Sequence, residues 1–343
     1  MAAPTLSPNQ PPAAMLLEML SGRWLSQAIS CAAELGIADH LKDGPRPVED
    51  LARELGAHED ALYRLLRSLE AYGIFAQPEP RRFGLTALGS TLKSDAPHSM
   101  RGVARLFGSE TMVRAWARMP FTIREGKPAL DQVTGTTGFD FLAADPAMAT
   151  LFHQAMTSFS RSETNAVLAR YDFSGIERMV DVGGGHGHLL AGILGRYPAM
   201  KGVLFELSHA LEGARATFAQ AGLGARVEVI AGDIFAESPP TADAVLMKHV
   251  LHDWSDDDAT AILKRCGAAL APGGRLLVAE MVEPAEPVPH PSKLLDLEML
   301  TVTQGGRERD LAAFEALFTA AGFRLARVVE TPAPISVLEA KLA

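Results

Sequence analysis

The spacing of apolar residues changes near Gly175 and divides the chain into two kinds of pattern. Before Gly175, apolar positions recur almost everywhere at helical intervals. After Gly175, short runs of aliphatic and β-branched residues alternate with helical stretches, which is typical of βαβ units and a parallel sheet. The sequence therefore predicts an α/β protein whose residues 175–343 form a doubly wound, Rossmann-like domain.

Seven strands are predicted in this second part, with helices between the first five of them. The helical patterns cover His188–Arg196, His209–Ala221 and Asp257–Leu270. Ser255 suits the N-cap of the last helix, because acidic residues follow it and favour the positive end of a helix. We expect Pro272-Gly273-Gly274 to end that helix. The strands are expected at Met179–Val182, Gly202–Glu206, Val227–Ala231, Ala244–Lys248, Arg275–Glu280, Phe323–Glu330 and Ile335–Ala340.

Residues 36–88 have the outline of a winged helix. Helical patterns at Val48–Leu55 and Glu59–Tyr72 precede a short hairpin of Ile74–Ala76 and Phe83–Leu85. The helix expected before this module, Met15–Leu35, has more apolar positions than one buried face requires, so we expect a homodimer interface there. The predicted divisions are a disordered tail (1–12), a winged-helix dimerisation domain (13–100), a helical linker and substrate-pocket region (101–174) and the Rossmann-like domain (175–343).

A winged helix often binds DNA, so charge decides between a regulator and a dimerisation module. Between Arg46 and Asp95 acidic residues outnumber basic residues by eight to seven, and the whole chain carries a net charge of −9. Acidic residues also open the helix that would enter the DNA groove. Because such a surface repels phosphates, we expect no nucleic-acid partner and assign the module to dimerisation.

The composition is that of a globular protein, with 48% hydrophobic and 21% charged residues. The sequence has neither the layout of a signal peptide nor a run of about 18 uncharged apolar residues. We therefore expect a cytoplasmic protein with no membrane partner. Cys31 and Cys266 each lie in an apolar helical pattern, which predicts two buried, reduced thiols and neither a disulfide nor a metal site.

A glycine-rich turn follows the first strand of the second part. Gly183, Gly185 and Gly187 form G-x-G-x-G, with His188 where a nicotinamide-binding fingerprint has its third glycine. Glycines let the backbone turn tightly and approach a ligand closely, although a plain strand-to-helix turn would explain them too. Asp181, inside the strand, is expected either to fix this loop through hydrogen bonds or to have a purely structural role.

Two acidic residues strengthen the prediction of a nucleotide-like ligand. Glu206 ends the second strand, 23 residues after Gly183, where a carboxylate can accept both ribose hydroxyls. Asp233, in Gly232-Asp233-Ile234, ends the third strand. Both lie at carboxyl ends of predicted parallel strands, where open α/β sheets bind ligands, so an adenosyl ligand is expected.

The fourth strand leads into the run Lys248-His249-Val250-Leu251-His252-Asp253-Trp254. With this run the chain resembles the S-adenosylmethionine-dependent small-molecule O-methyltransferases, which include plant caffeate-type and bacterial polyketide-tailoring enzymes. The resemblance covers nearly the whole chain, because a winged-helix front end is also typical of this family. The matching segments are residues 180–187, 205–207, 232–233, 248–254, 272–280 and 305–310.

The resemblance implies a role for each matched residue. His252 would be the general base that takes the proton of a substrate hydroxyl, Asp253 would sit beside it, and Glu280 and Glu308 would flank its imidazole. Lys248 would contact the cofactor. The cofactor set expected from motifs and resemblance together is Asp181, Gly183, Gly184, Gly185, Glu206, Leu207, Gly232, Asp233, Ile234 and Lys248. No metal is expected, since the family works without one and the acidic start at Asp256–Asp258 suits a helix dipole.

Elementary chemistry agrees with these roles. A sulfonium methyl group is already an activated electrophile, so the protein mainly has to align the nucleophile with it. A phenol titrates near 10, and a histidine can usefully remove its proton near neutral pH. A carboxylate bonded to the other ring nitrogen would fix the tautomer and stabilise the imidazolium.

The acceptor pocket is expected to be an aromatic slot closed by apolar and methionine side chains. Ordinary core packing is the alternative for each of these residues. His249 stands where plant members carry an aromatic residue, and Thr303 replaces their asparagine, so substrate identity does not carry over from them. The expected pocket residues are Trp116, Phe139, Phe152, Met156, Phe159, His249, Met299 and Thr303.

These observations predict a homodimeric, metal-independent O-methyltransferase that acts on an aromatic small molecule, such as a bacterial polyketide or related secondary metabolite, and releases S-adenosylhomocysteine. One alternative keeps the fold and cofactor but changes the reaction to hydroxylation or decarboxylation. The presence of Lys248, His252, Glu280 and Glu308 argues against it. A cofactor-sensing regulator is disfavoured by charge, and the fold alone does not distinguish oxygen from nitrogen or carbon as the accepting atom.

Overall fold

The computed structural model of the chain describes residues 11–137 and 140–343. It divides into two compact units, each made of two chain segments. The amino-terminal unit consists of the chain up to Arg114 together with Asp145–Phe159, and the carboxy-terminal unit consists of Ala115–Ala144 and Ser160–Ala343. The long helix α10 (Pro146–Arg170) supplies residues to both units.

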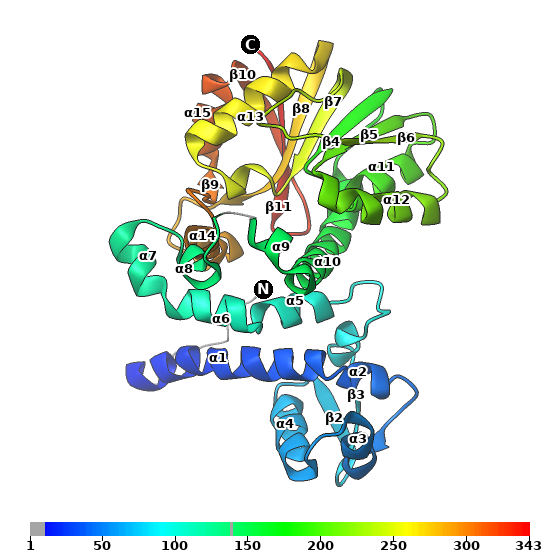
Figure 1. The fold of residues 1–343 in the computed structure, drawn as a ribbon, viewed down its shortest axis with the longest axis vertical. Helices are drawn as coiled ribbons and strands as arrows, with labels where there is room; N and C mark the ends of the chain where they lie inside the picture. The colour runs from blue at the N-terminus through cyan, green and yellow to red at the C-terminus, as the bar shows by residue number, and fades with distance from the viewer. Residues whose placement is uncertain (1–10, 138–139) are drawn as a thin grey trace. The chain divides into compact units, whose positions relative to one another are not determined.

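The amino-terminal unit contains a small winged-helix module (Figure 1). Helices α3 (Val48–Leu55) and α4 (Glu59–Ala71) pack beside an antiparallel sheet of order β1-β3-β2, and Leu51, Leu66 and Phe83 form part of the buried core. The sheet strands are β1 (Arg46–Pro47), β2 (Phe75–Glu79) and β3 (Arg82–Leu85). The remaining helices around this module are α2 (Ile37–His40), η1 (Gly89–Leu92), α5 (Arg101–Phe107) and α6 (Glu110–Ala117), the last of which crosses the unit boundary.

Helix α1 (Pro12–Glu34) leaves a row of large apolar side chains exposed. It buries only small residues near its end, Ser30, Ala32 and Ala33. The helix begins at Pro12, so the predicted tail of residues 1–12 is too long by that residue, while residues 1–10 lie outside the described part of the chain. The exposed apolar side chains are Leu16, Leu17, Met19, Leu20 and Trp24.

The carboxy-terminal unit is built on a mixed sheet of order β10-β11-β8-β7-β4-β5-β6. The five strands from β8 to β6 in this order run parallel, and β11 joins β8 antiparallel. The chain therefore reverses its winding direction at β4, where the strand order turns back toward β7. The strands are β4 (Arg178–Val182), β5 (Lys201–Glu206), β6 (Val227–Ala231), β7 (Ala242–Lys248), β8 (Leu270–Glu283), β10 (Phe323–Glu330) and β11 (Ile335–Leu342), and β9 (Arg309–Asp310) pairs with β8.

Helices cover both faces of this sheet (Figure 1). On one face, α11 (His188–Arg196) and α12 (Leu211–Gln220) enclose a core that includes Met179, Leu204 and Leu246. On the other, α13 (Asp256–Ala268) and α15 (Leu311–Ala320) pack on Val180, Phe205 and Val245. The predicted doubly wound architecture is thus confirmed, with every second side chain of a strand directed to the opposite layer.

Further helices of the carboxy-terminal unit are η2 (Ser208–Ala210), η3 (Leu251–Asp253), α7 (Met119–Glu125), α8 (Ala129–Thr134), α9 (Asp140–Ala144) and α14 (Pro291–Val302). None of the helices in the described ranges combines the length and apolar character needed to cross a bilayer.

Besides shifts of one to three residues at other element ends, three details differ from the sequence predictions. Helix α13 ends at Ala268, and β8 already begins at Leu270, so the Pro272-Gly273-Gly274 segment lies inside the strand and does not end the helix. The predicted helix His209–Ala221 begins with a 3-10 turn, since α12 starts only at Leu211. Cys266 is buried as predicted, but Cys31 is exposed on α1, because the predicted apolar pattern of that helix faces outward rather than into a core.

Candidate active site

The glycine-rich loop between β4 and α11 has a backbone that favours glycine over residues with a side chain. Gly183, Gly185 and Gly187 have φ values of 67°, 57° and 72°, in the left-handed region. A Cβ atom on Gly184 would lie 2.3 Å from a carboxylate oxygen of Asp181. Glu206, at the end of β5, accepts the N–H of Gly185 at 2.8 Å and so ties the loop to the neighbouring strand.

Asp181 lies beneath this loop without a hydrogen-bond partner for either carboxylate oxygen among the described residues. The expectation that its hydrogen bonds fix the loop is therefore wrong, because the side chain is 1% exposed and packs under Gly184. Burial raises the pKa of Asp181 to about 7, with Lys248 opposing that shift and Glu206 adding to it. Buried carboxyl groups normally have a hydrogen-bond partner, so this carboxyl group, unpartnered among the described residues, favours a ligand group or a water molecule at the loop.

These features fit an adenosyl ligand. The loop leaves space above Gly185, where an added Cβ would meet nothing within 4 Å. The carboxylate of Glu206 lies at the carboxyl end of β5, and Asp233 follows β6 and accepts the N–H of Phe235 at 2.8 Å. A side chain at Gly232 would collide with Phe205, so glycine is required there. The residues predicted for cofactor binding are thus brought to one edge of the sheet, where parallel strands end.

His252 lies just beyond the carboxyl end of β7, in the short helix η3. It is buried, and its Nδ1 donates a hydrogen bond to Oε1 of Glu308 at 2.7 Å. Oδ1 of Asp253 lies 3.6 Å from Nε2. Because Nδ1 carries the hydrogen in this arrangement, Nε2 has the free electron pair and is the nitrogen able to accept a proton.

Glu280, on β8, organises the backbone around His252. Its Oε1 accepts the N–H groups of Val250 and Leu251, each at 3.0 Å. Its Oε2 lies 3.9 Å from Nδ1 of His252 and 3.6 Å from Nδ1 of His249. One carboxylate therefore fixes the turn after β7 and places negative charge between two imidazoles.

Electrostatic interactions among these buried groups are strong. Burial would lower the pKa of His252, but Glu280, Asp253 and Glu308 raise it to about 10. Burial would raise the pKa of Glu280, but His252 and His249 lower it to about 2. The surrounding carboxylates thus favour an imidazolium at His252, which is the product of proton transfer from a phenol.

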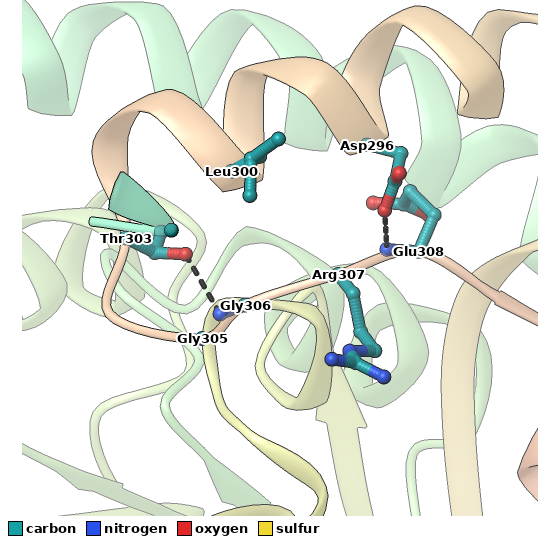
Figure 2. A pocket seen from close by; sticks show the side chains of 8 residues that line it. Asp296, Leu300, Thr303, Gly305, Gly306, Arg307 and Glu308 are labelled. Carbon is teal, nitrogen blue, oxygen red and sulfur yellow. Dashed lines mark hydrogen bonds between the residues drawn. The ribbon is translucent and has the colours of Figure 1, made fainter. Parts of the chain in front are cut away.

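Glu308 is held by a loop that connects α14 to β9 (Figure 2). The N–H of Glu308 donates to Oδ1 of Asp296 at 2.9 Å, and that of Gly306 to Oγ1 of Thr303 at 3.0 Å. The N–H of Arg307 donates to the carbonyl of His252 at 2.8 Å, so loop and base are directly joined. A pocket of about 360 Å³ adjoins this loop and is lined by Gly126, Asp296, Leu300, Thr303, Gly305, Gly306, Arg307 and Glu308.

Sequence reasoning missed Asp296, which lies twelve positions before Glu308 in no recognised motif. It also assigned Thr303 to the acceptor, whereas the Thr303 hydroxyl donates to the carbonyl of Met299 at 2.7 Å and accepts from Gly306. The polar atom of Thr303 is therefore occupied in shaping the loop.

The residues predicted for the acceptor pocket fall into two groups. Trp116, His249, Met299 and Thr303 belong to the carboxy-terminal unit, as His252 does. There the indole Nε1 of Trp116 donates to a carboxylate oxygen of Glu298. The second group, Phe152, Met156 and Phe159, lies on α10 within the amino-terminal unit, and the ring of Phe159 lies 6.4 Å from that of Phe107. Phe139 lies outside the described residues.

Glu163, on α10, is a second residue that the sequence did not reveal. Its Oε2 accepts from Nζ of Lys248 at 3.1 Å, and its Oε1 lies 2.8 Å from Nε2 of His249. The residue is buried, and it stands 85 positions before Lys248 with no motif to link them. Burial would raise the pKa of Glu163, but His249 and Lys248 lower it to about 2.

A metal ion has one set of candidate ligands in the described part of the chain. Ligand atoms of His249, His252 and Glu280 lie within 4.8 Å of one another. Nδ1 of His252 is already bonded to Glu308 at 2.7 Å, so only Nε2 of that ring could bind a metal ion without breaking this hydrogen bond.

Two family models match the chain. One, described as an O-methyltransferase domain, matches residues 116–324. The other, described as an O-methyltransferase dimerisation domain, matches residues 17–95.

Several curated relatives are similar over almost their whole length. A phenazine O-methyltransferase of Lysobacter antibioticus is 38% identical and covers 96% of this chain and 96% of its own. A mitomycin biosynthesis 6-O-methyltransferase of Streptomyces lavendulae is 38% identical over 95% of this chain and 93% of its own. An aclacinomycin 10-hydroxylase of Streptomyces purpurascens is 37% identical over 94% of this chain and 87% of its own.

Solved structures agree with these matches. The crystal structure of LaPhzM has a TM-score of 0.93 and 38% identity, and covers 97% of this chain and 100% of its own. NcsB1 from neocarzinostatin biosynthesis, solved with S-adenosylmethionine and 2-hydroxy-5-methyl naphthoic acid, has a TM-score of 0.78 and 32% identity over 93% of this chain and 96% of its own.

Proposed function

The chain belongs to the O-methyltransferase family, and we propose that His252 is the base that activates its acceptor hydroxyl. The family resemblance, the fold class and the dependence on S-adenosylmethionine that the sequence predicted are confirmed. The roles of individual residues, the class of the acceptor and a homodimeric assembly are proposed below from the contacts of the described residues.

The hydrogen bond between Nδ1 of His252 and Glu308 carries this proposal. It leaves Nε2 as the basic nitrogen and places a carboxylate where it stabilises the imidazolium that forms. Asp296, through the backbone N–H of Glu308, holds that carboxylate in position. Glu280 accepts the backbone N–H groups of Val250 and Leu251, just before His252, and adds a second negative charge.

S-adenosylmethionine, when bound, supplies an electrophilic methyl group. We assign its binding to the glycine loop and to the acidic ends of β5 and β6. Glu206 would accept ribose hydroxyl donors there, and the unpartnered carboxyl group of Asp181 would be available to a polar group of the ligand. The full set proposed to bind it is Asp181, Gly183, Gly184, Gly185, Glu206, Leu207, Gly232, Asp233, Ile234 and Lys248.

His252 performs the proton step of the reaction. Its Nε2 removes the proton of the acceptor hydroxyl while Nδ1–H stays bonded to Glu308. The charge that develops on the ring lies among Glu280, Glu308 and Asp253, so it requires little reorganisation of the surroundings. The surrounding carboxylates raise the pKa of His252 toward the range in which a phenol titrates, and so favour proton transfer from a phenolic acceptor to the ring.

We propose an aromatic hydroxyl compound of secondary metabolism as the acceptor. The relatives named for phenazine and mitomycin, and the naphthoic acid bound to NcsB1, support this class. Trp116 and Met299, which both belong to the carboxy-terminal unit, are proposed to contact the acceptor. A homodimer formed through α1 is proposed, since the dimerisation-domain match includes all of its exposed apolar row except Leu16.

The His252→Ala variant tests the base assignment. We expect it to bind S-adenosylhomocysteine as the wild type does in calorimetric titration, and to lose about 10²–10⁴-fold in turnover with a phenolic acceptor. His98→Ala is the matched control, because His98 is an exposed histidine of the other unit. Unchanged turnover of His252→Ala would remove His252 from the mechanism.

The same assay addresses the changed-reaction alternative. A relative is named as a 10-hydroxylase, so the family includes members named for another reaction. Binding of S-adenosylhomocysteine by the wild type, without methyl transfer to any hydroxyl in a broad phenolic screen, would favour that alternative.

A further inference from the structure

Beside the His252–Glu308 pair lies a second pair of a carboxylate and an imidazole, Glu163 and His249. The two imidazole rings are 4.9 Å apart and tilted by 33°. Between them lies Oε2 of Glu280, which has no hydrogen-bond partner among the described residues and stands within 4 Å of both histidines. The two pairs thus share one carboxylate.

The backbone of His249 indicates that this arrangement is imposed. His249 has a φ of 52°, one of two left-handed non-glycine residues in the described chain. Such conformations are unfavourable for residues with a side chain and persist where the surroundings over-determine them, often at functional sites. Here the N–H of His249 donates to the carbonyl of Ala279, and its Nε2 is held by Glu163.

We propose that Glu163 and His249 hold a positive charge against Glu280 and so restrain the pull of that carboxylate on the proton of His252. This inference rests on the proposed function, in which His252 is the base. His249 is a positioning residue in this scheme, because it acts through Glu280, and Glu163 acts through His249.

The groups around both rings are consistent with this role. His249 faces Glu163, Lys248 and Glu280, while His252 faces Glu280, Asp253 and Glu308. Burial would lower the pKa of His249, but Glu163 raises it, with Lys248 in opposition. A cation at His249 offsets one of the three negative charges near His252, so the imidazole of His252 gives up its proton more readily than it would without this neighbour.

The balance matters because a base must be unprotonated to act. Three carboxylates with no counter-charge would keep His252 cationic over a wide pH range. The pair of Glu163 and His249 therefore lowers the pH above which His252 is unprotonated and able to accept a proton.

Histidine NMR of the full-length protein tests the proposal directly. In the wild type we expect His249 to be doubly protonated at pH 7. In His249→Gln, which removes the charge but keeps an amide near Glu163, the titration midpoint of His252 is expected to rise by about one pH unit, a tenfold change in proton affinity. His249→Lys, which retains the charge, is expected to keep the midpoint near that of the wild type.

Glu163→Gln provides a second arm. It is expected to lower the titration midpoint of His249, because the anion that favours its cationic form is gone. A neutral His249 in the wild type at pH 7 would overturn the proposal, as would a His252 midpoint that His249→Gln leaves unchanged. The wild-type measurement needs no variant, so the proposal stays testable even if a substitution prevents folding.

The outcome is separable from that of the proposed function. The titrations report on charge alone, whereas His252→Ala turnover reports on the base. A shifted His252 midpoint together with unchanged turnover of His252→Ala would refute the base assignment and leave the electrostatic coupling standing. The reverse combination would retain the base and refute the role of His249.

Discussion

Two clusters of charged side chains use glutamate carboxylates for different ends. In the amino-terminal unit, Arg81 at the tip of the hairpin pairs with Glu49 and Glu59, in the first turns of α3 and α4, and its guanidinium lies 4.7 Å from the ring centre of Tyr63. This Arg81 cluster is about 40–50% exposed. In the carboxy-terminal unit, Glu163, His249, His252, Glu280 and Glu308 form a buried cluster, which we call the His252 cluster.

The difference teaches what burial does to charge. Water screens the Arg81 cluster, so its ion pairs contribute little beyond fixing the hairpin on the two helices. The His252 cluster is removed from water, so each charge strongly changes the proton affinity of its neighbours. Within the winged-helix module, the charge of Arg81 is therefore paired with two carboxylates of the same module.

The largest effect of a charge-only change is expected at Glu308. Glu308→Gln keeps an oxygen that can accept from Nδ1 of His252 but loses the negative charge. We expect turnover to fall about 10–10³-fold with little change in S-adenosylhomocysteine affinity, since an adjacent opposite charge shifts a pKa by about 1–3 units. Steady-state kinetics beside Glu315→Gln, an exposed glutamate on α15, measure this. Equal turnover of the two variants would contradict the role of Glu308.

A smaller effect is expected on acid stability. The folded-state pKa of Glu163 is about 2, below its ordinary value of 4.5. Such a group stabilises the fold above its unfolded-state pKa, and that stabilisation is lost as the pH falls through the folded-state pKa. We therefore expect the wild type to be more stable than Glu163→Gln at about pH 5–7, and we expect this difference to vanish toward about pH 2.

Urea unfolding midpoints across this pH range measure the difference. Glu228→Gln serves as the control, because Glu228 is 61% exposed and pairs with Arg178 at the surface. A difference between wild type and Glu163→Gln that stayed constant down to pH 2 would show that the carboxylate charge is not what stabilises.

The smallest effect is expected at Arg81. Arg81→Ala should lower Tm by no more than about 3 °C and leave turnover unchanged, because exposed ion pairs contribute little. Thermal unfolding monitored by circular dichroism measures this. A large loss of stability would erase the contrast between the two clusters.

Much of the fold could be predicted because it depends on local pattern. The bounds of β6, β10, α3 and α11 match the predicted ones. Strand and helix patterns of apolar residues depend only on residues that are contiguous in the sequence. The end of α13 was missed because Pro272 and the glycines after it, which usually stop a helix, lie here inside β8.

The candidate site was predictable only where motifs exist. His252, Glu280 and Glu308 were placed by resemblance, and the structure brings them together. Glu163 was missed because its partner His249 is distant from it in the sequence. Asp296 was missed because it bonds to the backbone N–H of Glu308, a contact that no sequence motif indicates. The hydrogen bond from Gly306 to the hydroxyl of Thr303 was likewise not predicted, because it shapes a loop that no motif describes.

The central claim, that His252 is a general base, is tested most directly by comparing the wild type with His252→Ala over a series of ring-substituted phenolic acceptors of increasing acidity. An acceptor that is already ionised needs no base. We therefore expect the turnover defect of about 10²–10⁴-fold to shrink steadily as the acceptor hydroxyl becomes more acidic. A defect of the same size for every acceptor would contradict the claim, because it would mean that His252 acts only by positioning the substrate.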